Sequence, residues 1–433
     1  MKVLNLRVRE AFVVAIFFLY MVINFADKAV IGIVAVPVMR DLHLTPAEFG
    51  MVASSFFLLY SLSGVAFGFL ANHFKAKALI IILALIWALT QFPIAWWPYL
   101  PVLVGCRILL GVGEGPAYPV AIHAAYKWFP DKRRNLVSSI IAQGAPAGVV
   151  IAAPLLSILL VKYGWRSAFI ALGVVGLLWV LVWAVMGAEG TQGDDLGPGS
   201  LATSHDRSNV SARVPYALLL RDPSVLGTIV ASFACYWILT MGLTWLPPYL
   251  RVGLGYSVIN TGWLVSIIMG ASIPLQIGAA WASQRALQKG VSSRIARGGV
   301  LGGFVGVGGI CVILAMLVNV AAPLRISLIA LGFALPLVAF GIGPAIIAEV
   351  TPAPQRGALL AINNSVATLA GLIAPAVTGW IIQGQSTPGL GYVAGYLCAG
   401  AILLLGGVTS LLLINPAISQ MRLSRFRTAL RPA

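Results

Sequence analysis

Twelve long apolar stretches dominate the sequence, and each is long enough to cross a bilayer as a helix, which takes about 20 residues. They raise the apolar fraction to 60% and leave 9% of the residues charged, whereas soluble proteins carry about 25% charged residues. Because so few charges cannot cover soluble domains, we predict an all-α integral membrane protein. The expected spans are 11–36, 47–70, 78–98, 100–126, 135–161, 167–187, 223–250, 258–284, 298–318, 325–348, 357–383 and 389–414.

The basic residues are distributed unevenly between the loops. Lysine and arginine number 28 against 12 acidic residues, a balance of +16 that in a soluble chain would suggest a nucleic-acid partner. The loops on the side of the two termini hold 21 of the basic residues, and the opposite loops hold five. Since basic loops stay on the cytoplasmic side, we predict cytoplasmic termini in an inner membrane, contact with anionic lipid headgroups, and no nucleic-acid partner.

The spans divide into two similar sets of six. The polar stretch 188–222 is rich in Gly and Ser and is typical of a flexible linker. We therefore expect one bundle over 1–187 and a second over 223–433, which ends in a basic cytoplasmic tail. Pro130–Arg134 precedes span five and Pro352–Arg356 precedes span eleven with the same P-x-x-x-R spacing. Two pseudo-symmetric six-helix bundles around an axis along the membrane normal are typical of transporters.

Four ionisable residues lie deep inside the spans, all in the first half. Asp27 and Lys28 are in span one, and Arg107 and Glu114 are in span four. Arg107, Gly111 and Glu114 share one helical face, with the two charged residues about 10 Å apart along the axis. Charges inside a membrane cost at least about 2.5 kcal/mol each and mark functional sites. The alternative is that they form two structural ion pairs between helices.

The sum of these four charges is zero. An anion bound among them would leave a charge of −1, which one proton on Asp27 or Glu114 would neutralise. Each ligand then makes the binding of the other more favourable, so the electrostatics predict coupled binding of an anion and a proton. The expected coupling ion is the proton, and we expect no cofactor and no metal.

Uncharged side chains on other spans are further candidates for substrate binding. Tyr60 could donate its hydroxyl to a carboxylate or a sugar, with simple packing as an equal alternative. Gln143 and Asn364 each lie eleven residues before the proline of an Ala-Pro pair, so they could face each other across the axis between the halves. The alternative is helix–helix hydrogen bonding, worth about 0.6 kcal/mol. Tyr236 and Trp237 could stack on a ring or simply pack.

Several of these residues match a known family. The chain resembles the anion:cation symporter branch of the major facilitator superfamily over essentially its whole length, at Asp27-Lys28, Arg107-x-x-x-Gly-x-x-Glu114-Gly-Pro-x-x-Pro119, Trp128-Phe-Pro130, Gly164-Trp-Arg-Ser-Ala-Phe169, Trp245-Leu-Pro and Asn363-Asn364. The resemblance implies the major facilitator fold and proton-driven import of an organic carboxylate, such as a sugar acid, by alternating access. It also implies that Asp27 and Glu114, close to Arg107, carry protons and that Lys28 holds the substrate carboxylate. Asn363 joins the substrate-binding candidates on the same ground.

The chain departs from this family at three places. Lys28 stands where the family more often has Arg, so planar bidentate pairing with a carboxylate is lost. The superfamily loop motif G-x-x-x-D-R-x-G-R-[RK] has Asn72-His73 in place of its Asp-Arg, and the copy after span eight has Gln284-Arg285. Both changes remove an acid that ordinarily holds the cytoplasmic gate, so weaker gating is one expectation.

The expected function is that of a monomeric symporter, and the motifs of several other classes of membrane protein are missing from the sequence. A drug-efflux antiporter would carry G-x-x-x-G-P-x-x-G-G in span five, and the sequence from Gly144 to Gly148 lacks it. An anion antiporter or a non-transporting membrane receptor remains an alternative. No nucleophile–base pair or H-E-x-x-H motif supports an enzyme, and the four cysteines stand singly in apolar stretches without metal-ligand spacing.

Overall fold

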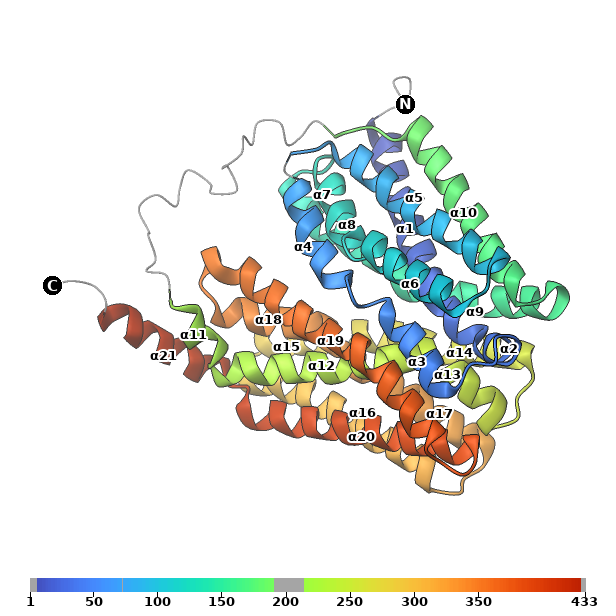
Figure 1. Ribbon diagram of the computed structural model, residues 1–433. Coiled ribbons are helices and arrows are strands. Elements are labelled where there is room, and N and C mark those ends of the chain that lie inside the picture. Colours follow the sequence, from blue (N-terminus) through green and yellow to red (C-terminus); the bar gives the residue numbers. More distant parts are fainter. Residues whose placement is uncertain (1–5, 72, 191–213, 430–433) are drawn as a thin grey trace. The chain divides into compact units, whose positions relative to one another are not determined.

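The computed structural model describes residues 6–71, 73–190 and 214–429. All regular structure within these ranges is helical (Figure 1), and twelve helical segments there are long and apolar enough to cross a membrane, from Val8–Ile33 to Pro388–Leu413. The expected all-α fold with twelve spans is therefore confirmed. The helices of the first six spans are α1 (Leu6–Ile33), α2 (Ala35–Asp41), α3 (Pro46–Ser55), α4 (Tyr60–Leu70), α5 (Ala76–Trp96), α6 (Leu100–Glu114), α7 (Ala117–Tyr126), α8 (Asp131–Ala142), α9 (Gly144–Tyr163) and α10 (Trp165–Met186).

The second half follows the same plan. A short helix, α11 (Tyr216–Leu220), precedes its spans, and residues 191–213 of the expected linker lie outside the described residues. The remaining helices are α12 (Pro223–Thr244), α13 (Leu246–Pro248), η1 (Tyr249–Gly253), α14 (Val258–Gly270), α15 (Ser272–Gln288), η2 (Arg294–Gly299), α16 (Val300–Leu317), α17 (Ala322–Ala334), η3 (Pro336–Val338), α18 (Ala339–Val350), η4 (Ala353–Gln355), α19 (Arg356–Gln383), α20 (Pro388–Leu413) and α21 (Pro416–Ala429).

Several spans are interrupted near their middle. Span four breaks between α6 and α7 at Gly115-Pro116, because Pro116 has no N–H to donate to the preceding turn. Span five breaks at Gln143, between α8 and α9. Interrupted spans are frequent at the binding sites of transporters, because the break exposes backbone and side-chain polar groups inside the bundle.

Contacts divide the chain into two compact units. Unit 1 comprises Met1–Ser204 with Leu243–Ser266 and Pro375–Gln383, and unit 2 comprises the remainder. Unit 1 therefore includes the far ends of spans seven and eleven and the start of span eight. The expected division into bundles 1–187 and 223–433 stays a prediction.

The core of unit 1 contains a group of packed aromatic rings among aliphatic residues. Tyr20 on α1 lies 4.5 Å from Trp87 on α5 and 4.7 Å from Trp179 on α10, measured between ring centroids. Trp183 stacks on Trp179 at 6.0 Å. Large rings fill the space between α1, α5 and α10 and fix how deep the polar residues of α1 lie.

Unit 1 includes two segments of the second half, Leu243–Ser266 and Pro375–Gln383, and glycines let them pack closely against spans one and two. A Cβ atom on Gly32 would collide with the Leu243 carbonyl, and one on Gly50 with the Pro375 carbonyl. Trp245 donates its indole N–H to the same Pro375 carbonyl at 3.0 Å. These close approaches join one end of spans seven and eleven to α1 and α3.

Unit 2 is built around the pairing of α16 and α20. A Cβ atom on Gly407 would press against Gly306, and Gly302 lies equally close to α20. This is the close helix packing that small residues permit in membranes.

Candidate functional site

The four intramembrane charges are all buried in unit 1. The exposed fraction is 1% for Asp27, 4% for Lys28, 3% for Arg107 and 1% for Glu114. Asp27 and Lys28 lie near the C-terminal end of α1, and Arg107 and Glu114 lie on α6. The structure therefore brings together the four residues that the sequence singled out.

Lys28 is at the centre of this cluster. Its Nζ forms an ion pair with Glu114 Oε2 and donates to Asn24 Oδ1 at 2.6 Å. The ring centroids of Phe25, Phe56 and Tyr60 lie 4.7, 5.4 and 5.7 Å from Nζ. Cation–π attraction to desolvated rings is worth about 2 kcal/mol, so the ammonium group is held by a carboxylate, an amide and three rings.

Arg107 contacts the backbone of Asp27 and does not form an ion pair with its carboxylate. Arg107 Nη1 donates to the backbone carbonyl of Asp27 at 3.5 Å, and its guanidinium lies 5.1 Å from the Phe56 centroid. The carboxylate of Asp27 forms no ion pair with any residue in the described ranges. Of the two structural ion pairs that formed the alternative interpretation, only that of Lys28 is present among these residues.

Three side-chain atoms of the four charged residues have no hydrogen-bond partner in the described part of the chain, namely Asp27 Oδ1, Glu114 Oε1 and Arg107 Nε. Buried polar groups are nearly always paired, and an exception calls for an explanation. The cluster therefore has unused donor and acceptor capacity, which suits a site that binds and releases protons or an anion.

Glycines on span four bring α3 and α4 against the cluster. A Cβ atom on Gly111 would collide with the Phe56 carbonyl, and one on Gly115 with the Tyr60 carbonyl. The backbone of span two therefore occupies the space beside Gly111. This contact carries the Phe56 and Tyr60 rings to the charged groups.

Asn24 and Gln91 are cluster residues that sequence reasoning missed. Asn24 is 2% exposed and Gln91 is 1% exposed, and Gln91 on α5 lies close to Asp27. Neither amide atom of Gln91 has a hydrogen-bond partner among the residues described. Asn24 could have been found from its i−4 spacing to Lys28, which puts both on one helical face.

The candidates of the second half lie in unit 2, on α12 and α19. Asn363 is 7% exposed and its Oδ1 is unpartnered within the described residues, whereas Asn364 is exposed. Trp237 is buried beside Phe233 at 6.0 Å, and Tyr236 meets the edge of Phe340 at 5.9 Å.

Gln143 lies in unit 1, half-buried at the break between α8 and α9. Its Oε1 has no hydrogen-bond partner among the described residues. A role for Gln143 opposite Asn364 stays a prediction.

Other acids occupy the neighbourhood of the two altered loop motifs. Asn72 lies outside the described residues. In unit 1, Glu189 after span six accepts from the Lys77 backbone N–H at 2.6 Å and pairs with Lys127 at 3.4 Å. In unit 2, Glu349 at the end of α18 pairs with Arg297.

The comparisons with known proteins agree with this architecture. Residues 16–343 match the family described as Major Facilitator Superfamily. Among curated relatives, the probable sulfoacetate transporter SauU of Cupriavidus necator is 26% identical over 92% of both chains. The hexuronate transporter of Bacillus subtilis is 26% identical, covering 94% of this chain and 95% of its own. The D-galactonate transporter of Escherichia coli is 25% identical, covering 92% and 96%.

Two solved structures share the fold. The inward-open xylose transporter XylE from E. coli has a TM-score of 0.73 at 14% identity, covering 96% of this chain and 99% of that one. A bacterial homolog of the human lysosomal transporter Spinster has a TM-score of 0.72 at 18% identity, covering 98% and 99%. Fold, span count and relatives together define an integral membrane transporter, and not an enzyme. The chain belongs to the Major Facilitator Superfamily, and the resemblance to its anion:cation symporter branch is confirmed by relatives that are named sugar-acid and anion transporters.

Proposed function

We propose that the protein imports an organic carboxylate together with protons by alternating access. The observation that carries the proposal is the buried cluster of Asp27, Lys28, Arg107 and Glu114, which is neutral as a whole and incompletely paired. A neutral cluster tolerates burial. Adding an anion to it leaves one uncompensated negative charge, which a proton removes.

Lys28 is the residue that connects the anion to the proton. Its ammonium group pairs with Glu114, so a substrate carboxylate must compete with Glu114 for it. A proton on Glu114 removes that competition and frees Lys28 for the substrate. Binding of each ligand thereby favours the other, as thermodynamic linkage requires.

Asp27 is the second proton-carrying candidate. Its side chain is buried without a cation at ion-pair distance among the described residues. A buried carboxylate without a partner is costly, so a proton on Asp27 removes a charge that nothing in contact with it balances. Arg107 then remains as the positive group that favours entry of an anion.

The cluster and the names of the relatives both support the proposed substrate class. One ammonium group suits a monoanion, and Tyr60 and Gln143 of the same unit offer polar groups to sugar hydroxyls. The relatives are named for sulfoacetate, hexuronate, galactarate or D-glucarate, and D-galactonate. We place a sugar acid first and a small sulfonated carboxylate second.

The sidedness and the gate belong to the same proposal. The distribution of basic residues between the loops supports cytoplasmic termini in an inner-membrane protein, and we expect a monomer. Glu189 and Glu349 hold Lys127 and Arg297 and so supply the loop contacts for which the family motif uses other acids. Gating then survives the substitutions at Asn72 and Gln284.

Uptake into proteoliposomes tests this function. Purified protein is given hexuronate, galactonate, galactarate or sulfoacetate with and without a pH gradient that is acidic outside. We expect gradient-driven accumulation of at least one acid, which is lost in Asp27→Asn and Glu114→Gln and retained in the control Glu48→Gln. Gradient-driven accumulation retained in both cluster variants would refute the coupling assignment. Counterflow without any effect of pH would favour the antiporter alternative.

A further inference from the structure

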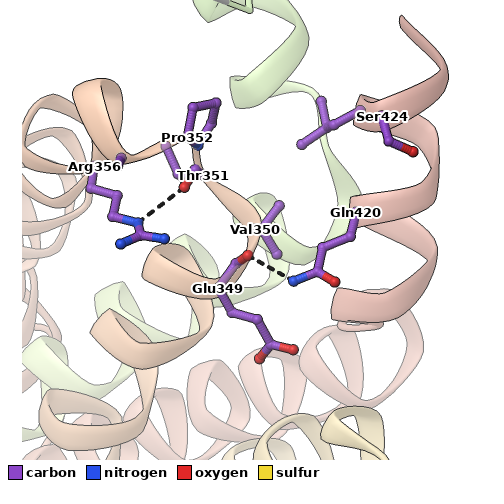
Figure 2. Close-up of a pocket in the computed structure, with 9 residues that line it drawn as sticks. Glu349, Val350, Thr351, Pro352, Arg356, Gln420 and Ser424 are labelled. Atoms are coloured by element: carbon purple, nitrogen blue, oxygen red, sulfur yellow. Dashed lines mark hydrogen bonds between the residues drawn. The ribbon is translucent and has the colours of Figure 1, made fainter. Parts of the chain in front are cut away.

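A cavity of about 330 Å³ lies in unit 2, where span ten ends and span eleven begins (Figure 2). Residues from the end of α18 and the start of α19 form one side, and α21 forms the other. Its polar lining comes from Glu349, Thr351, Arg356, Gln420 and Ser424. None of these residues belongs to the buried charge cluster of unit 1.

The cavity is held open by fixed contacts on both sides. Ser419 on α21 donates to Asp222 Oδ1 at 2.7 Å, and Gln420 Nε2 donates to the Glu349 carbonyl at 2.9 Å. Leu423 is buried in an apolar cluster with Val350 and Leu359. These contacts attach α21 to the ends of spans seven, ten and eleven, so the cavity is a built feature of the fold.

Two charged residues line the cavity, Glu349 and Arg356, and only Glu349 has an ion-pair partner among the described residues. Glu349 lines it, but its carboxylate already pairs with Arg297 and accepts from Ser293 Oγ at 2.6 Å. Arg356 donates its Nε to the Thr351 carbonyl at 3.1 Å and forms no ion pair with a described residue. The guanidinium of Arg356 therefore provides one positive charge that the surrounding side chains do not balance.

One residue of the lining also has a buried hydroxyl group without a partner among the described residues. Thr351 is 2% exposed, and its Oγ1 has no hydrogen-bond partner in the described ranges. Leaving such a group unpaired costs about 1–3 kcal/mol. A ligand oxygen in the cavity would accept from the Thr351 hydroxyl and from Arg356 together.

We propose that this cavity binds a phosphate group, and that the source is the headgroup of an anionic phospholipid. Arginine is the preferred partner of phosphate oxygens, and a phosphodiester with one negative charge matches the single unpaired cation. Because the cavity lies at the ends of two spans, a bilayer crossed by these spans would bring its headgroups close to the cavity. Its wall α21 carries the exposed apolar residues Ile418 and Met421, which are typical of a helix at a membrane surface.

Binding at this site would attach α21 to the lipid surface and stabilise unit 2. The test is thermal unfolding of the full-length protein in neutral detergent, followed by tryptophan fluorescence. Short-chain phosphatidylglycerol is titrated against phosphatidylcholine of the same chain length, and inorganic phosphate is titrated separately. We expect stabilisation by phosphatidylglycerol that saturates, and little stabilisation by phosphatidylcholine, whose choline cation would lie against Arg356.

Variants locate the effect. Arg356→Gln should raise the apparent Kd for phosphatidylglycerol about tenfold, the ratio that corresponds to a loss of about 1.4 kcal/mol. Thr351→Val should raise it several-fold, and it keeps the test decisive if Arg356→Gln does not fold. Arg422→Gln is the matched control, an arginine on α21 that does not line the cavity, and it should leave the Kd unchanged.

Three results would overturn the proposal. Equal weakening by Arg356→Gln and Arg422→Gln would mean diffuse attraction to a charged surface. Unchanged binding in both Arg356→Gln and Thr351→Val would exclude the cavity. Equal stabilisation by inorganic phosphate at the same concentration, lost in the same two variants, would keep the phosphate site but refute its lipid source.

Discussion

The ion pair between Lys28 and Glu114 allows the charge balance of the cluster to be tested by a double-mutant cycle. Lys28→Met leaves the cluster at −1, Glu114→Gln leaves it at +1, and the double variant is neutral again. Removing one partner of a buried pair costs about 3–5 kcal/mol, whereas replacing both by apolar or neutral groups can be close to neutral. We therefore expect each single variant to lose about 4 kcal/mol of unfolding free energy, and the double variant to lose less than either.

The assay is reversible unfolding at pH 7 in mixed micelles titrated with sodium dodecyl sulfate. Lys162→Met, at an exposed basic residue, is the control and should stay within about 0.5 kcal/mol of wild type. The reasoning would be refuted if the free energy lost by the double variant equalled the sum of the two single losses within about 0.5 kcal/mol. The two side chains would then not interact. None of the three cluster variants should show gradient-driven uptake: the two that carry Lys28→Met lack the anion-binding group, and Glu114→Gln lacks the proton carrier.

Three further predictions concern other parts of the structure. Gly50→Val places a side chain against the Pro375 carbonyl, so we expect that end of unit 1 to open, measured as faster labelling of a cysteine at Ser54; unchanged labelling would contradict this. Gln355→Ala leaves the buried N–H and carbonyl of Val214 unpaired and should cost about 2–4 kcal/mol of unfolding free energy; a loss below about 0.5 kcal/mol would mean that water replaces the amide. The hydrogen bond from Trp165, assisted by Arg166, holds the pKa of Asp41 below its ordinary value. This contact stabilises the fold above pH of about 4, and the stabilisation is lost as the pH falls through the lowered pKa of Asp41. The difference in Tm between wild type and Asp41→Asn should therefore vanish in acid. A Tm difference that persists in acid would refute the role of the Asp41 carboxylate.

The spans could be predicted from the length of the apolar stretches. The charged residues could be predicted because charges are rare inside such stretches. Asp27, Lys28, Arg107 and Glu114 stand out in spans that otherwise hold no charge. Their pairing could not be predicted, because it depends on how α1 and α6 are rotated against each other. Glu114 pairs with Lys28 rather than with Arg107, in keeping with the separation expected along α6.

The rest of the site needed the structure for a physical reason. Phe56 resembles any aromatic residue that packs in a core, and its contact with Lys28 follows from the close approach of α3 to Gly111. Gln91 is a single amide in an apolar span, and nothing local indicates that it lies close to Asp27. The cavity lined by Thr351 and Arg356 forms only because α21 folds back onto the ends of spans seven and ten. This contact joins residues that are far apart in the sequence.

Proton movement that accompanies the substrate is the most direct test of the proposed symport. Weakly buffered proteoliposomes receive the transported sugar acid without an imposed gradient, and the external pH is recorded. We predict external alkalinisation on addition of the substrate to wild type, and none with Glu114→Gln. Substrate uptake in wild type without any pH change would contradict proton symport and leave an anion exchanger as the function.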